Sequence, residues 1–207
     1  MTAGRVIRSF AAPASNPVGL AWDGRTLWIC DEMTGLIYQV DVVTGQVIHS
    51  WPSPADYPED LAWDGKAIWV GVDALNVLYQ MDPVTGTVLQ ALSTPVATAE
   101  ALSWGAGRLW VGISTDNIIA QVDPTTGRLL YSFSAPGTRT RGLAWVDGLL
   151  FLTDTTQDLI WQVDPISGRV IRSFATPGTD GHSIAWDGRT LWLCDTGTDL
   201  IYQIAVT

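Results

Sequence analysis

Four residues with ionisable side chains recur in this sequence at a constant interval of 41 residues. They are Glu59, Glu100, Arg141 and His182, and Val18 occupies the same position one interval earlier. Two carboxylates, a guanidinium and an imidazole that meet in space could bind a small polar ligand. They could also do acid–base chemistry, because histidine titrates near neutral pH and a glutamate could partner it. The alternative is a polar ring whose members only hydrogen-bond one another, through glutamate–arginine pairing, and bind no ligand.

Three further residues accompany this set, and each is unique to its interval. Each lies two positions before a member of the set, and they are Tyr57, Arg139 and Asp180. We expect them to surround the set and to contact a bound ligand. If the protein is an enzyme, the two glutamates and the histidine of the set would be its catalytic residues, in a lyase, hydrolase or cyclotransferase reaction.

Two equivalent segments are rich in oxygen ligands. Each contains two aspartates four residues apart, Asp154 with Asp158 and Asp195 with Asp199, with threonines between them. Such segments are loosely similar to calcium-binding loops, in which every ligand is an oxygen atom. A divalent cation such as Ca²⁺ is therefore a candidate ligand of these four aspartates.

The net charge of −10 restricts the possible partners. An acidic protein repels nucleic acid and anionic lipid, so we expect neither as a partner. Most of the acidic residues fall in a few connecting segments, which favours a cation, a small polar or cationic ligand, or a protein partner. Solubility and aspartate-stabilised turns are the other explanation of these acids. We expect the protein to be a monomer.

Membrane and export signals are not recognised in the sequence. No stretch approaches the roughly 18 uninterrupted apolar residues that a membrane helix needs. The first residues lack the apolar segment of a signal peptide, and the compartment is left open. The two cysteines, Cys30 and Cys194, occupy the same position of two intervals. We expect them to be buried free thiols, because equivalent strands place them too far apart for a disulfide.

An internal repeat explains the constant interval. Five similar segments begin at glycines and span residues 4–44, 45–85, 86–126, 127–167 and 168–207. Repeats of this length indicate solenoids, propellers or arrays. We expect the five segments to form one domain that spans residues 1–207.

Each repeat contains four short runs of β-branched and aromatic residues, in the first complete set 19–22, 27–30, 36–40 and 46–51. Asp-Gly between the first two runs predicts a tight hairpin, and Asp-Pro-x-Thr-Gly predicts a turn between the last two. Residues 27–30 are all apolar, so both faces of that strand must be covered, which sheets stacked around an axis permit. The sequence therefore predicts an all-β, five-bladed β-propeller of four-stranded antiparallel blades.

The two ends of the chain predict how the ring closes. The last repeat stops after its third run, 200–204, and the chain begins with a run of the fourth type, 5–10. We expect the N-terminal strand to complete the last blade. The first run of each repeat should be innermost, so the set that begins with Val18 should surround one mouth of the axis. That mouth lies on the face formed by the second-to-third and fourth-to-first connections, which we call the upper face.

Two other repeated residue types receive structural interpretations. Tryptophans on the first and second runs are expected to fill the gaps between splayed blades. Glutamines recur on the third run, at positions 39, 80, 121, 162 and 203, and we expect each to hydrogen-bond to neighbouring backbone.

The repeat, with GLAWDGxxLW in its first half and IYQVDPxTGxV in its second, resembles the propeller repeats of virginiamycin B lyase-like, NHL-like and plant-type glutaminyl cyclase families. The last of these are five-bladed, which fits the five repeats found here. The lyase-like family has seven blades and a His/Glu/His group with a magnesium ion, and no matching group is found in this chain. The leading hypothesis is therefore a non-enzymatic binding propeller that uses its upper face and axial mouth, and an enzyme at that mouth is the alternative.

Overall fold

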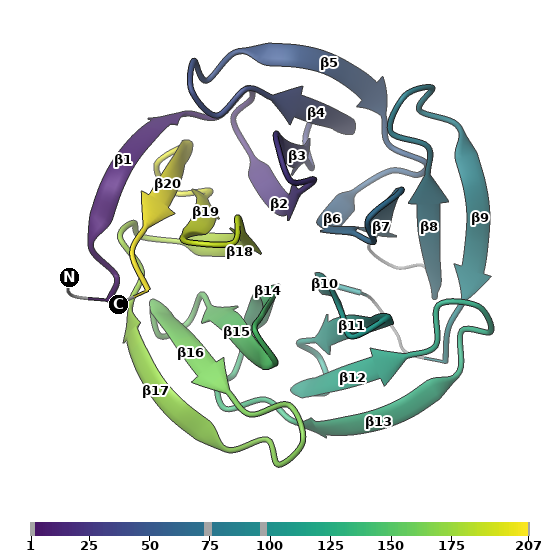
Figure 1. The fold of residues 1–207 in the computed structure, drawn as a ribbon, viewed down its shortest axis with the longest axis vertical. Coiled ribbons are helices and arrows are strands. Elements are labelled where there is room, and N and C mark those ends of the chain that lie inside the picture. The colour runs from purple at the N-terminus through teal and green to yellow at the C-terminus, as the bar shows by residue number, and fades with distance from the viewer. Residues whose placement is uncertain (1–2, 73–75, 96–98, 207) are drawn as a thin grey trace.

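Five four-stranded antiparallel sheets surround a common axis in the computed structural model of the chain (Figure 1). The structure describes residues 3–72, 76–95 and 99–206. Each sheet is one blade, in which the first strand lies nearest the axis and the fourth strand is outermost. The predicted all-β, five-bladed propeller is therefore confirmed. The described residues form strands and turns, and they include no helix long and apolar enough to cross a membrane.

The twenty strands of the described residues divide among the blades as follows. Blade 1 has β2 (Pro17–Trp22), β3 (Leu27–Asp31), β4 (Leu36–Val40) and β5 (Val47–Pro52), and blade 2 has β6 (Pro58–Trp63), β7 (Ile68–Val72), β8 (Val77–Met81) and β9 (Val88–Ser93). Blade 3 has β10 (Ala101–Gly105), β11 (Arg108–Ile113), β12 (Ile118–Val122) and β13 (Leu129–Ser134), and blade 4 has β14 (Thr140–Val146), β15 (Leu149–Asp154), β16 (Leu159–Val163) and β17 (Val170–Ala175). Blade 5 has β18 (Gly181–Trp186), β19 (Leu191–Asp195), β20 (Leu200–Ile204) and β1 (Val6–Ala11).

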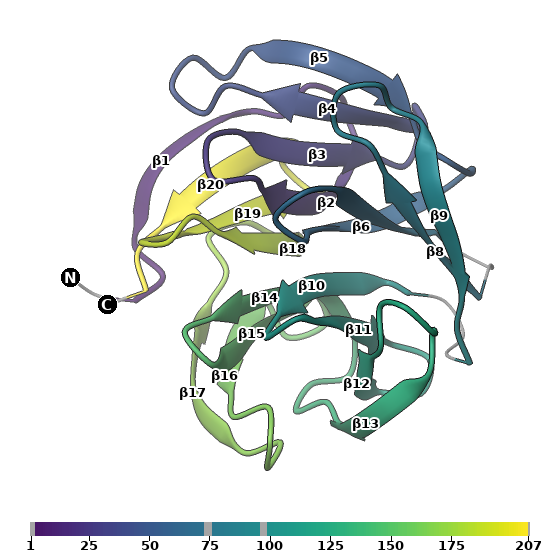
Figure 2. The same cartoon turned by 45° about the vertical axis from the view of Figure 1, so that its right-hand side comes forward.

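The N-terminal strand closes the ring as the sequence predicts. β1 pairs antiparallel with β20, in a register that includes Ser9 opposite Tyr202, and the Gly4 amide donates to the Ala205 carbonyl at 2.9 Å. The two strands stay side by side when the ring is turned (Figure 2). Blade 5 is therefore assembled from both ends of the described chain.

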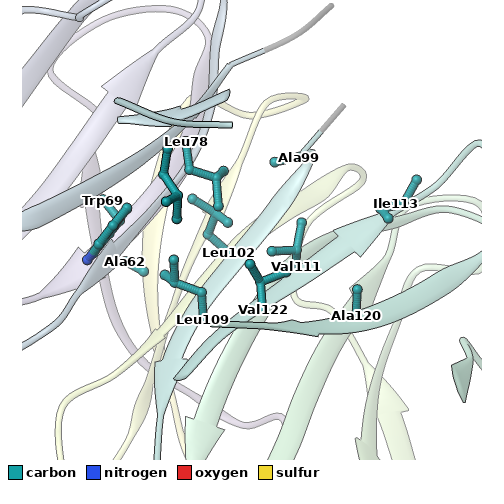
Figure 3. Packing of buried hydrophobic residues seen from close by; sticks show 11 residues of the cluster. Ala62, Trp69, Leu78, Ala99, Leu102, Leu109, Val111, Ile113, Ala120 and Val122 are labelled. Carbon is teal, nitrogen blue, oxygen red and sulfur yellow. The ribbon is translucent and has the colours of Figure 1, made fainter. Parts of the chain in front are cut away.

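The core lies between the blades rather than within them. Trp28, Trp69 and Trp192 on the second strands are each 1% exposed, and a tryptophan buries about 150–250 Å² of mostly apolar surface. Figure 3 shows one interblade cluster, where Trp69 of blade 2 packs near Leu102 and Leu109 of blade 3. Both faces of the second strands are covered, which explains why these strands are apolar at nearly every position.

The first-strand tryptophans differ in part from their predicted place. They are partly buried, pack at the edges of the interblade clusters, and line a narrow axial channel of about 80 Å³; they are Trp22, Trp63, Trp104, Trp145 and Trp186. The thiols of Cys30 and Cys194 are free and fully buried, as predicted, and burial raises the pKa of both.

An aspartate in the turn between the first and second strands organises each of three blades. In blade 1, Asp23 accepts hydrogen bonds from the backbone amides of Arg25 and Thr26 at 2.8 and 2.6 Å, and from Trp28 Nε1 at 2.9 Å. Gly24 supplies the positive φ of 97° that the turn needs. The Gln39 amide donates to Thr26 Oγ1 at 2.9 Å, within the same cluster. The prediction that these glutamines bond to backbone is wrong for this blade, because the turn itself provides side-chain acceptors.

Candidate functional site

A backbone irregularity places the 41-residue set at the axis. In blades 1, 2, 4 and 5 the pairing between first and second strands shifts register at the start of the first strand, and the extra residues include Val18, Glu59, Arg141 and His182. Such β-bulges re-aim a side chain locally. The innermost strands β2, β6, β10, β14 and β18 converge in Figure 1. The side chains of Val18, Glu59, Arg141 and His182 line one pocket at the start of these strands. We call these four residues, together with Glu100, the axial ring.

Arg141 joins the two glutamates of the axial ring. Its Nη1 atom lies 3.2 Å from Glu59 Oε2 and 3.1 Å from Glu100 Oε2, and the side chains are 9–14% exposed. Ser114 also donates a hydrogen bond to Glu100. One guanidinium therefore partners two nearly buried carboxylates, and this part of the ring carries one net negative charge.

His182 contributes a different kind of group to the ring. Its Nδ1 lies 2.7 Å from the Val18 carbonyl oxygen, which can only accept, so Nδ1 carries the hydrogen and Nε2 has a free lone pair. Burial, with the nearby charge of Arg141 as the second cause, lowers the pKa of His182 to about 4. At neutral pH the imidazole is therefore uncharged and its Nε2 is a hydrogen-bond acceptor.

A pocket of about 260 Å³ opens beside these groups. Its lining includes Glu59, Arg141 and His182 from the axial ring, and also Arg139 and Asp180 from the surrounding set. Glu100 reaches this group through Arg141. Tyr57 is 60% exposed and is not among the lining residues. The structure thus brings together most of the residues singled out from the sequence.

Sequence reasoning missed four lining residues, which are Asn16, Glu32, Thr155 and Thr196. Asn16 Nδ2 donates to Glu32 at 2.8 Å, and Thr196 Oγ1 donates to Asp180 at 2.6 Å. Glu32, Thr155 and Thr196 occupy one repeat position, just after the second strand, and Ser114 is their counterpart in blade 3. Variation at that position was a visible signal; Asp73, the counterpart in blade 2, lies outside the described residues.

A single buried carboxyl group lies directly beneath the axial ring. Asp60 is fully buried and accepts hydrogen bonds from the Leu20 amide at 3.2 Å, the Leu102 amide at 2.7 Å and the Ser183 hydroxyl at 2.6 Å. These donors belong to blades 1, 3 and 5, so one side chain of blade 2 connects four blades across the axis. Burial raises the pKa of Asp60 well above its ordinary value, and the hydrogen bonds oppose that shift in part.

The aspartates proposed for a calcium site serve as acceptors for the backbone. Asp154 is fully buried, and its carboxylate accepts from the amides of Thr138 at 2.5 Å and of Thr156 and Gln157 at 2.9 Å. Asp195 is equally buried and accepts from the Asp180 and Thr198 amides.

Their partners in sequence, Asp158 and Asp199, are exposed and have positive φ angles of 53° and 55°. Among the described residues no cluster of three or more His, Cys, Asp or Glu is arranged to hold a metal ion. Calcium binding at these aspartates stays a prediction.

Comparisons with sequence families give no assignment. No family model matches the chain, and no curated protein matches it.

Solved structures share the fold. A glutaminyl cyclase from Myxococcus xanthus superposes with a TM-score of 0.83 at 13% identity, covering 98% of this chain and 97% of that one. Virginiamycin B lyase from Staphylococcus aureus gives a TM-score of 0.60 at 17% identity, covering 96% and 69%. A chain of a mitotic checkpoint complex gives 0.58 at 12% identity, covering 98% and 92%. The resemblance to cyclase and lyase propellers is confirmed for the fold, and the third similarity shows that the fold alone does not select an activity.

Proposed function

We propose that this propeller binds a small polar amine in the axial pocket. The observation that carries the proposal is the charge around the pocket: Glu32, Glu59 and Asp180 line it with Arg139 and Arg141, and Arg141 also pairs with Glu100, so acidic side chains outnumber basic ones. A bound amine could donate to His182 Nε2 and to the carboxylates of Glu32 and Asp180, each of which also accepts one side-chain hydrogen bond within the protein. A protonated amine donates up to three hydrogen bonds and carries the charge that such a pocket attracts.

The geometry favours binding over proton transfer by the glutamates. A glutamate that acts as a general base must reach the substrate proton within hydrogen-bond distance. Glu59 and Glu100 instead contact the same guanidinium atom, and Ser114 holds Glu100 from the other side. These contacts hold Glu59 in the pocket wall and Glu100 behind Arg141.

Calorimetric titration with putrescine and glycinamide, using neutral acetamide as the comparison, tests the proposal. Binding of the two amines should weaken as salt is added, because the attraction is electrostatic. Asp180→Asn and His182→Ala should each weaken binding about tenfold, the loss of one charged or buried hydrogen bond. Asp116→Asn removes an equal charge from an exposed loop of the upper face outside the pocket and should leave affinity nearly unchanged.

Two results would contradict the amine proposal. The first is binding of acetamide as tight as that of glycinamide, which would remove the role of the charge. The second is an equal loss of affinity in Asp116→Asn and Asp180→Asn, which would assign the effect to the acidic face as a whole.

An enzyme at the same pocket is the second candidate, and one observation favours it. His182 has an uncharged imidazole with a free Nε2 in the pocket, as a general base requires. The five-bladed glutaminyl cyclase that matches nearly the full chain suggests a peptide with an N-terminal glutamine as the first substrate to try. The assay measures release of ammonia from this peptide. Release by the parent protein that is lost in both His182→Ala and Glu59→Gln would establish an enzyme in place of simple binding.

A further inference from the structure

A second pocket, of about 310 Å³, lies between blades 3 and 4 on the face opposite the axial mouth. Trp110, Gln121 and Tyr131 of blade 3 line it from one side, and Trp145, Pro165 and Ile166 of blade 4 from the other. Most of these side chains are aromatic or apolar.

Three other blades show which group accepts the hydrogen bond of the second-strand tryptophan. The tryptophan of the second strand donates from Nε1 to a turn aspartate at 2.9 Å in blades 1, 2 and 5. In blade 2 the same oxygen, Asp64 Oδ2, also accepts from Gln80 Nε2 at 2.6 Å. A carboxylate oxygen between an indole N–H and a glutamine amide is thus the repeated arrangement.

Blade 3 keeps both donors and lacks the carboxylate. Trp110 and Gln121 occupy the tryptophan and glutamine positions, and Gly105 stands where blades 1, 2 and 5 have aspartate. Trp110 is 3% exposed, and its Nε1 is buried without a hydrogen-bond partner among the residues that the structure describes. An unpaired buried donor is costly, so this N–H has a strong preference for an acceptor. Arg108 stands at the position of Thr26 in blade 1.

Aromatic walls define the rest of the pocket. The Trp145 ring stacks on Trp110 with centroids 5.5 Å apart and an interplanar angle of 19°. It lies over Gly105, where an added Cβ would be 2.2 Å from the indole. Tyr131 donates to the Ile166 carbonyl at 2.8 Å and so ties the outer wall of blade 3 to blade 4. The result is a pocket with aromatic walls, and the unpaired Trp110 Nε1 is buried behind its surface, with Trp145 stacked on the Trp110 ring.

We propose that this pocket binds a small aromatic carboxylate. Its carboxylate would take the place that Asp64 Oδ2 has in blade 2, accepting from Trp110 Nε1 and from the Gln121 amide. Its aromatic body would pack against Trp145 and Tyr131, since offset ring stacking is favourable. Because Trp110 Nε1 is covered, binding requires the Trp145 ring to slide across Trp110. This site is separate from the axial pocket, and the proposal does not depend on the amine ligand there.

Phenylacetate is the probe, and the indole N–H signals in ¹H–¹⁵N spectra are the measurement. The Trp110 signal, assigned through Trp110→Phe, should move downfield and saturate with millimolar phenylacetate as its N–H acquires an anionic acceptor. Affinity, followed through the other signals, should fall roughly tenfold in Trp110→Phe and in Gln121→Leu, each of which removes one donor.

A matched variant and a matched probe control the experiment. Trp161→Phe also removes a buried indole N–H without a partner from the described residues, but Trp161 does not line this pocket, so affinity should stay unchanged. Benzyl alcohol keeps the ring and lacks the carboxylate, so it should bind at least tenfold more weakly. A Trp110 signal that does not move would overturn the proposal. So would equal affinity for benzyl alcohol, or equal losses in Trp110→Phe and Trp161→Phe.

Discussion

Replacing Asp60 by alanine tests whether one buried side chain holds the five blades together. The substitution removes the acceptor shared by blades 1, 2, 3 and 5, directly beneath the axial pocket. Alanine itself fits the strand, because Ala101 occupies the same position in blade 3. The loss should therefore come from missing hydrogen bonds rather than from steric conflict.

The contacts give the expected size of the effect. The Leu20 amide keeps a second acceptor, Ser183 Oγ at 3.1 Å. The Leu61 and Leu102 amides lose their Asp60 oxygens, from which they lie 2.8 and 2.7 Å away. Each buried donor without an acceptor costs about 1–3 kcal/mol, or about 2–6 kcal/mol for the two amides. Relief of the buried carboxyl offsets part of this, so we expect about 3 kcal/mol of lost stability and a melting temperature lower by roughly 10 °C.

Urea unfolding followed by tryptophan fluorescence measures this loss, with Asp56→Ala as the control. Asp56 is exposed on the same blade, and its removal should change the free energy of unfolding by less than about 0.5 kcal/mol. Coincident unfolding midpoints for the two variants would refute the assignment of Asp60 as a central hydrogen-bonding group. A loss confined to the slope of the transition would refute it too, because that change reports on compactness.

Three other changes have defined outcomes. Deleting residues 1–10 removes most of β1 and exposes the edge of β20, so calorimetry should show a marked fall in melting temperature, and an unchanged value would contradict ring closure. The lowered pKa of His182 means that its stabilising contribution is complete above pH 6.5 and is lost as pH falls through about 4. That contribution is about 3 kcal/mol, so His182→Gln should show a smaller loss of unfolding free energy from pH 7 to pH 4 than the parent, and parallel losses would be inconsistent with a buried neutral imidazole. Asp64→Gly copies the blade 3 turn into blade 2 and should cost roughly 2–4 kcal/mol in urea unfolding, since Trp69 and Gln80 lose their acceptor; a negligible cost would show that these bonds add no stability.

The blade architecture could be predicted because each element is specified five times. The strand 36–40 was placed correctly to the residue, and the others were within two residues. The first strands begin earlier than predicted, at Pro17 in blade 1, because a bulge at Val18 lets pairing resume beyond it. A bulge adds a residue without changing the alternation pattern that sequence reasoning uses, so it left no signal.

The candidate site was predictable only where chemistry varies at one repeat position. That variation identified the axial ring, and the structure places its members together. The structural role of Asp60 was not predicted, although Asp60 also breaks the repeat, with Gly19 and Ala101 at the same position in blades 1 and 3. Its role depends on donors from three other blades, and distances across the axis are not encoded in the pattern of a single strand.

Departures from the repeat therefore fall into two physical classes. Asp60 breaks the repeat and finds every partner it needs inside the protein, so its effect is on stability. His182 and Gly105 also break it, but they leave His182 Nε2 as a free acceptor and Trp110 Nε1 as an unpaired donor, each beside a pocket. Because a buried polar atom without a partner costs free energy, the unpaired Trp110 Nε1 supports the ligand proposed for the interblade pocket, and His182 Nε2 offers an acceptor to a ligand of the axial pocket. On this reasoning the axial pocket should bind a hydrogen-bond donor and the interblade pocket a hydrogen-bond acceptor. A ligand of one pocket should therefore not bind in the other.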